Sequence, residues 1–206
     1  MLKIWGRTNS INVQKVLWTC AELDLPFERI DAGMQFGVNN TPEYRAMNPN
    51  GLVPLINDDG FLLWESHAIV RHLARKHGLG SLCPADPRQA ADADRWMEWY
   101  STTLWNHMKP VFWNLVRTPP EKRNPAEVED NRVKLAGYLA MADVQLTGHD
   151  FFAGTAFTMA DIPHAVLAHR WFKLPIERPA LPNYERWFKN VSARPGFQKH
   201  CASPLT

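Results

Sequence analysis

Strand-like patterns stop at residue 64, and this limits the fold more than any other feature of the chain. Four short apolar runs before that point are typical of strands: Leu2–Trp5, Phe27–Ile30, Val53–Ile56 and Phe61–Trp64. The turn residues 57–60 predict that the last two runs form a hairpin. Helical spacing predicts helices after the first, second and fourth runs, over residues 13–21, 42–47 and 66–77. The predicted order is βαβαββα, whose initial βαβ unit and final hairpin predict a mixed sheet flanked by helices.

The remainder of the chain shows only helical patterns. The segment 78–87 is rich in Gly, Pro and Asp, which predicts a linker. Residues 88–116 predict a long helix or a pair of helices, with a bend or break near Pro110 because proline cannot donate the helical hydrogen bond. Another helix is predicted over 121–146. We therefore predict an α/β domain over residues 1–77, a linker over 78–87, and an all-helical domain over 88–206.

The composition is that of a globular protein and excludes several classes of function. The 206 residues carry a formal net charge of +2 without a basic tail, so nothing predicts binding to nucleic acid. No apolar stretch approaches the roughly 18–20 residues of a membrane span, and the N-terminal sequence lacks the apolar core of a signal peptide. The three cysteines lie far apart, which argues against a disulfide framework, a zinc ribbon or a CxxC redox centre. We therefore expect a cytoplasmic protein with no membrane partner and no metal.

The segment Phe157–Ile162 contains the clearest local signal of the second half, a helix capping box. Thr158 can accept a hydrogen bond from the Asp161 N–H while the Asp161 carboxylate reaches back. A catalytic Asp161 is the alternative, but capping accounts for every position of the pattern. We therefore assign Asp161 a structural role.

Polar residues fill the segment Thr8–Asn12, between the first predicted strand and the first predicted helix. Sheets flanked by helices bind ligands at the carboxyl ends of their strands, so residues in this position favour a binding site. Ser10 or Asn12 can simply cap the helix. The two roles are compatible, because a hydroxyl or amide at a helix start, with the free N–H groups and the positive end of the helix dipole, can also donate to a thiolate.

Two further segments combine a structural interpretation with a functional one. Pro54 at the start of a strand predicts a turn, and a cis Val53–Pro54 bond with an exposed Val53 backbone would let an extended peptide ligand pair there. Ser66 is a natural helix N-cap, but the neighbouring Glu65 is harder to explain by folding alone. A carboxylate there can hold an ammonium group while Ser66 and the helix N–H groups hold a carboxylate, which suits the α-carbon end of an amino acid.

In this order, these segments resemble those of the cytosolic glutathione transferases, over essentially the whole chain. The matching motifs are Ser10–Val16 after the first strand, Asn48–Pro54, Glu65–Ser66 followed by Ala68–Ile69, and the capping box Thr158–Asp161. The resemblance implies an N-terminal thioredoxin-like domain that binds glutathione and a C-terminal helical bundle that supplies most of the pocket for an electrophile. It also implies a role in detoxification and a two-fold homodimer.

By matching position, the resemblance implies which residues bind most of the glutathione molecule. Val53, beside a cis Pro54, would pair its backbone with the cysteinyl unit. Glu65 and Ser66 would hold the γ-glutamyl end.

The glycyl end has fewer matching residues. Asn39 falls where relatives often place a His, Gln or Lys near this end, and Asn50 is the second candidate. Leu52 stands where many relatives have a basic residue, so one expected contact with the glycyl carboxylate is missing.

The resemblance also implies how the thiol is activated. Relatives use Tyr, Ser, Cys or, in some bacterial and fungal groups, Asn near the end of the first strand, and this sequence has no Tyr there. Ser10 matches the position of the catalytic Ser, Thr or Cys and is the first candidate, and Asn12 is the second. This pattern indicates a bacterial-type member. Because position 10 is not Cys, a mixed disulfide with glutathione is disfavoured, and with it the glutaredoxin-like classes.

The resemblance places the electrophile between the loops of the first domain and one helix of the second. That helix carries Trp105, His107, Trp113 and Arg117, whose aromatic members predict an apolar pocket. His107 and Arg117 can bind an acidic group on the electrophile, or they can make ordinary polar contacts between helices.

Three functions are consistent with this reading. The first is conjugation of reduced glutathione to a small electrophile such as an alkyl or aryl halide or an α-halo acid. The second is glutathione-dependent disulfide or peroxide reduction, or isomerisation, on the same scaffold. The third is a non-catalytic binding module. The presence of Ser10, Glu65 and Ser66 argues against it, because a protein that has lost its activity has no need to keep a site for a peptide ligand.

Overall fold

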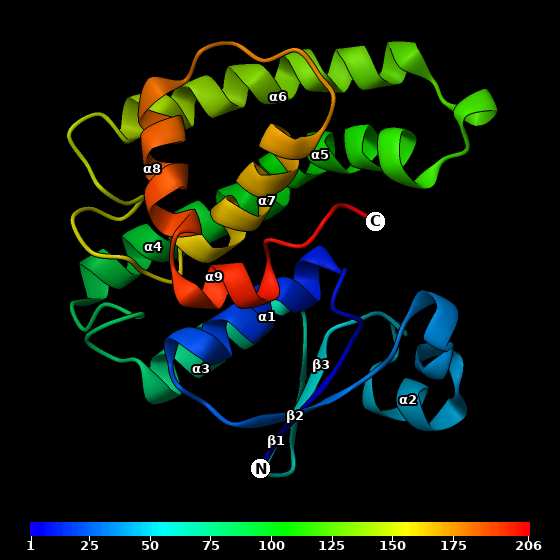
Figure 1. Cartoon of the computed structure of the whole chain (residues 1–206). Helices are drawn as coiled ribbons and strands as arrows, with labels where there is room; N and C mark the ends of the chain where they lie inside the picture. Colours follow the sequence, from blue (N-terminus) through cyan, green and yellow to red (C-terminus); the bar gives the residue numbers. More distant parts are fainter.

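The computed structural model describes all residues, 1–206, as a sheet-containing part followed by a helical part (Figure 1). The sheet contains four strands, β1 (Leu2–Trp5), β2 (Phe27–Ile30), β3 (Leu55–Asp58) and β4 (Phe61–Trp64), in the order β2-β1-β3-β4. Strand β1 pairs parallel with β2 and antiparallel with β3, and β3 pairs antiparallel with β4. The mixed sheet and the thioredoxin-like βαβαββα order are therefore confirmed.

Helices α1 (Ile11–Glu22) and α3 (Ser66–His77) pack together on the side of the sheet that faces the helical part (Figure 1). The short helix α2 (Pro42–Met47) lies to one side, after two 3-10 turns at Met34–Phe36 and Val38–Asn40. Helix α1 is buried on two faces. Val13 and Val16 belong to the core between the sheet and helices α1 and α3, whereas Trp18 belongs to the core of the helical part. This double burial makes α1 the element that joins the two parts.

Strand β3 begins two residues later than the sequence pattern predicts. The predicted run Val53–Ile56 is replaced by Leu55–Asp58, because the ladder with β1 starts where Leu55 pairs with Trp5 and because Pro54 has no N–H to donate. The cis Val53–Pro54 bond is confirmed. Asp58 pairs with Phe61, so the hairpin turn consists of Asp59 and Gly60, both with positive φ, rather than residues 57–60.

The second part is all-helical, as expected. Its helices are α4 (Pro87–Trp99), α5 (Trp105–Phe112), α6 (Pro125–Gln145), α7 (Asp161–Lys173), α8 (Pro182–Ser192) and α9 (Pro195–His200). Wide π turns at Tyr100–Leu104 and Trp113–Arg117 precede and follow α5, and a 3-10 turn covers Pro120–Lys122. The predicted helix over 121–146 therefore starts later, at Pro125, where the Asn124 side chain caps it.

The helix is not broken at Pro110, contrary to one of the two predicted outcomes. Helical backbone is continuous from residue 87 to residue 117, and Pro110 lies inside α5. Met108 and Val111, on either side of it, are fully buried, and this packing offsets the lost hydrogen bond. The wide turns lie before and after the proline rather than at it.

Asp161 has the structural role that its sequence pattern predicts, with a different detail. Its carboxylate accepts the Thr158 N–H at 3.0 Å, but the Thr158 hydroxyl accepts from Ala160 N–H, and the Asp161 N–H binds the Thr158 carbonyl. Asp161 is fully buried and lines none of the cavities described below. Burial raises the pKa of its carboxyl to about 6, opposed by the hydrogen bonds that it accepts.

The two parts are also joined at their edge. Glu22, at the end of α1, accepts from the Trp18 indole at 2.7 Å and pairs with Arg194 at 2.5 Å. The Arg194 guanidinium lies 4.1 Å from the centre of the Phe157 ring, which in turn packs against Trp18.

No helix in the structure has both the length and the apolar character needed to span a membrane.

Candidate active site

A cavity of about 390 Å³ lies between the two parts of the chain. Its walls come from the loop after β1, the start of α1, the loop before α2, the segment before β3, helix α5 with its π extension, and α7. The lining residues are Arg7, Asn9, Ser10, Ile11, Asn12, Gly33, Met34, Asn39, Leu52, Val53, Trp105, Lys109, Phe112, Trp113, Arg117 and Arg170. Most residues that the sequence analysis singled out are therefore brought to one place.

The loop after β1 reaches the cavity because Gly6 allows a close approach to α1. A Cβ atom at Gly6 would lie 2.3 Å from Val13 Cγ2, so no other residue fits without displacing the helix. Ser10 occupies the N-cap position of α1, but its side chain makes no capping hydrogen bond. Its hydroxyl is therefore available to donate to a ligand.

Asn12 is the second residue of α1, and its amide is anchored on one side only. Its Oδ1 accepts from Lys15 Nζ at 3.0 Å and from Ser66 Oγ at 3.4 Å, whereas its Nδ2 has no partner within the chain. Ser10 and Asn12 thus place two free donors beside the N–H groups that open α1.

A second, smaller hollow continues the cavity toward α3. It holds about 40 Å³ and is lined by Asn12, Asn48, Asn50, Leu52, Val53, Pro54, Trp64, Glu65 and Ser66. Asn12, Leu52 and Val53 line both spaces, so the two are adjacent. The Val53 N–H and carbonyl make no hydrogen bond within the chain, which leaves both for an extended ligand.

Glu65 and Ser66 lie at the far end of this hollow. The N-cap residue of α3 is Glu65, with φ 71°, and Ser66 is the first helical residue, so the predicted N-cap at Ser66 is shifted by one. A positive φ in a non-glycine residue is strained, and such strain is common at ligand sites. The exposed Glu65 carboxylate and the first N–H groups of α3 present opposite charges to one ligand.

Asn39 and Asn50 are placed differently. Asn39 lines the larger cavity, where its Nδ2 donates to the Gly51 carbonyl at 2.6 Å and its buried Oδ1 has no partner. Asn50 lines the smaller hollow, and its N–H binds the Asn48 side chain. Only Asn39 presents an unpaired buried atom.

The larger cavity is strongly cationic, which the sequence analysis found only in part. Beside Arg117 it contains Arg7, Lys109 and Arg170, and none of the four forms an ion pair with an Asp or Glu side chain. Arg117 donates instead to the main-chain oxygen of Thr206 and to Met34 Sδ. The Nε atoms of the three arginines are buried without partners. Burial lowers the pKa of Arg170 to about 10 and also lowers that of Arg7 and Arg117. Of the cations that the sequence analysis missed, only Arg170 had a signal in the sequence. It is a charged residue within the buried helical run 161–171, where a charge needs a reason.

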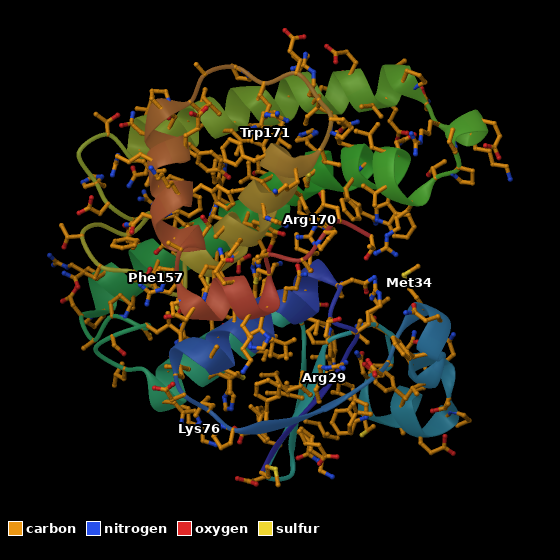
Figure 2. All side chains as sticks on the ribbon, in the orientation of Figure 1. Arg29, Met34, Lys76, Phe157, Arg170 and Trp171 are labelled. Atoms are coloured by element: carbon orange, nitrogen blue, oxygen red, sulfur yellow. The ribbon has the colours of Figure 1, made fainter.

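The position of Arg170 is visible in Figure 2, where it lies between α7 and the start of α1. One of its nitrogens donates to Gln14 Oε1 at 3.1 Å, which ties α7 to α1 across the two parts of the chain. Its guanidinium also lies 5.3 Å from the centre of the Phe112 ring. Arg170 thus supports the cavity wall as well as its charge.

The aromatic residues of α5 divide between the cavity and the helical core. Trp105 and Trp113 line the cavity, and Trp113 is 47% exposed at its rim. His107 lies outside it: the ring binds Asn131 Oδ1 at 3.0 Å and stacks on Tyr138 of α6. The expected pocket therefore does not include His107, because residues 105 and 107 project from different faces of the helix.

The fold and site together define a class of enzyme that holds a small peptide thiol at a thioredoxin-like domain, next to a second pocket supplied by helices. The family model "Glutathione S-transferase, N-terminal domain" matches residues 1–75, and "Glutathione S-transferase, C-terminal domain" matches residues 104–195. The chain therefore belongs to the glutathione S-transferase family and is a glutathione transferase.

Individual relatives match along the whole chain. Glutathione S-transferase GstB of Escherichia coli (strain K12) is 40% identical, with 100% of each chain covered. Glutathione S-transferase 3 of Zea mays is 32% identical over 98% of this chain and 94% of the plant protein. The crystal structure of a theta class enzyme from Xanthomonas axonopodis pv. citri with glutathione bound superposes with a TM-score of 0.96 at 40% identity, covering 100% of this chain and 99% of the other.

Proposed function

We propose that the protein joins the thiolate of reduced glutathione to a carbon atom of a small electrophile, an alkyl or aryl halide or an α-halo acid. The observation that carries this proposal is the pair of adjacent spaces in which Ser10 and Asn12 present free donors next to the unpaired backbone of Val53. In the reaction the sulfur forms a bond to carbon, and the carbon–halogen bond breaks as halide leaves with the electron pair. The thiol proton goes to solvent.

The binding mode that we propose follows the length of the hollow. Glu65 holds the γ-glutamyl ammonium group, while Ser66 and the start of α3 hold the γ-glutamyl carboxylate. Val53, before cis Pro54, pairs with the cysteinyl backbone. We assign the glycyl end to Asn39, whose buried Oδ1 is unpaired, and to Asn50 as second candidate.

Thiolate stabilisation explains the need for Ser10 and Asn12. A free thiol has a pKa of about 8.5, so lowering it by about two units requires roughly 2.7 kcal/mol of preferential stabilisation. Each hydrogen bond to a charged acceptor contributes about 1.5–3 kcal/mol. Two donors and the N-terminus of α1 are therefore sufficient without a protein base.

Among the electrophiles, we propose that those with a carboxylate are favoured. Four cationic side chains line the larger cavity without Asp or Glu partners, and Trp105, Phe112 and Trp113 supply apolar surface beside them. An α-halo acid offers both the leaving group and the anion that such a pocket suits.

Calorimetric titration with reduced glutathione tests the binding site. We expect Glu65→Ala to weaken binding about 10- to 150-fold, because the lost charge-assisted contact contributes about 1.5–3 kcal/mol. The matched control is Glu121→Ala, which removes an exposed carboxylate that lines neither the cavity nor the hollow and should leave the affinity unchanged. Absence of binding by the unaltered protein would refute the proposed function and favour a non-catalytic module.

We further propose that two chains form a homodimer in the cytoplasm. Phe61, Leu62 and Trp64 of β4 are exposed, and an open hollow of about 600 Å³ lies beside them between β4 and α3. Sedimentation is expected to give about twice the 23.6 kDa chain mass, and a species of 23.6 kDa alone would contradict the dimer.

The free state of all three cysteines supports the cytoplasmic location, which fractionation of the source cells would test.

A further inference from the structure

A buried chain of hydrogen bonds lies directly behind Asn12. Lys15, on the next turn of α1, is only 2% exposed. Its Nζ lies 3.0 Å from Asn12 Oδ1, 3.1 Å from His67 Nε2 and 4.2 Å from the centre of the Tyr100 ring. The other ring nitrogen of His67 lies 2.9 Å from Ser101 Oγ.

With Lys15 in its ammonium form, the chemistry of these groups determines the direction of each bond. A lysine nitrogen carrying its three protons only donates, so the atom of Asn12 that faces it is the carbonyl oxygen, and the amide nitrogen is turned away. His67 Nε2 must accept from Lys15, so the proton of its neutral ring is on Nδ1 and is donated to Ser101. Burial and the neighbouring Lys15, Arg71 and His164 lower the pKa of His67, which is consistent with a neutral ring.

Nothing in the packing alone requires a lysine at this position. Lys15 forms no ion pair with a carboxylate, and its burial lowers the pKa of its amine. The charged groups whose fields reach it are Arg170, which lowers its pKa further, and Glu65, which raises it. A methionine would fill the same space without the cost of burying an amine.

We propose that Lys15 is a positioning residue: held by His67 and Tyr100, it fixes the Asn12 amide so that Nδ2 donates to the thiolate of bound glutathione. This inference rests on the proposed function and assigns Asn12 as the oriented donor, with Ser10 as its neighbour. Ser66 Oγ, at 3.4 Å from Asn12 Oδ1, reinforces the same orientation.

The test is a double-mutant cycle read by ultraviolet difference titration of the thiol of bound glutathione. We expect Lys15→Met to raise the pKa of the bound thiol by about one unit, from about 6.5 to about 7.5, which lowers the fraction of thiolate at pH 7 about threefold. Calorimetry should show glutathione affinity within about threefold of the unaltered protein, because Glu65, Ser66 and Val53 are untouched. In an Asn12→Ala background, Lys15→Met should leave the thiol pKa unchanged.

Each other result has a distinct meaning. An equal rise in both backgrounds would show that Lys15 acts through its charge and would overturn the positioning role, as would no rise in either. If Lys15→Met does not fold, His67→Leu removes the ring nitrogen that accepts from Lys15 and should give a smaller rise that again requires Asn12. An unchanged thiol pKa would count against the proposal. A thiol titrating as in free glutathione in the unaltered protein would refute the proposed function, and this inference with it.

Discussion

Asp161→Ala is expected to lower the free energy of unfolding by about 3–5 kcal/mol. One carboxylate oxygen accepts from the Phe152 N–H at 3.1 Å and from the Trp187 indole at 2.9 Å, and the other accepts from the Thr158 N–H at 3.0 Å. Alanine would leave these buried donors without partners, and each such group costs about 1–3 kcal/mol. The bonds connect α7 with α8 and with the loop before α7, so the loss affects the whole helical part.

Urea denaturation of the unaltered protein and of three variants would check this expectation. Asp161→Asn keeps one acceptor oxygen but places a donor NH2 group opposite buried donors. It should therefore lower the free energy of unfolding less than alanine does. Asp150→Ala removes a nearby exposed carboxylate and should change stability by no more than about 0.5 kcal/mol. A loss for Asp161→Ala no larger than that for Asp150→Ala would contradict the structural role.

Arg117→Met is expected to lower kcat/KM for an α-halo acid about 10- to 150-fold. The side chain lines the cavity, is partly desolvated and pairs with no Asp or Glu side chain, so its bond to a substrate carboxylate would contribute about 1.5–3 kcal/mol. The corresponding α-halo amide has the same leaving group and similar size but no charge. Its kcat/KM should change less than about threefold.

Steady-state kinetics with the acid and the amide would separate charge recognition from general damage. Arg7→Met removes a second cation of the cavity and should also affect the acid selectively. Lys122→Met removes an exposed cation outside the cavity and should affect neither substrate. Equal losses for acid and amide would show that Arg117 acts on the shape of the pocket. Turnover of disulfides or peroxides with none of halides would instead favour the reductase alternative.

Local patterns predicted most elements of the fold because the signals are local. The apolar runs at Leu2–Trp5 and Phe61–Trp64 match β1 and β4, and the end of the last predicted helix of the first domain matches His77. Two of the discrepancies have tertiary causes. Pairing with β1 decides where β3 begins, and core packing around Pro110 keeps α5 helical despite the proline.

The candidate site divides in the same way. Ser10, Val53 and Glu65 stand in short motifs at ends of strands and starts of helices, so their position at the candidate site follows from the order of elements. His107 shares a helix with Trp105, but which residues face the cavity depends on where α6 packs. Arg7, Lys109 and Arg170 come from three distant segments without a shared motif, so only folding reveals that they meet.

The sequence by itself determined the class of this protein: a βαβαββα domain followed by helices, with the glutathione-binding motifs in order. These features depend on periodicity, turn residues and capping groups, which act over a few residues. Only the tertiary structure decided the charge of the second pocket, the exclusion of His107, and the anchoring of Asn12 by Lys15 and His67. Burial and hydrogen-bond direction belong to pairs of groups far apart in the chain, and they exist only once the two parts are packed together.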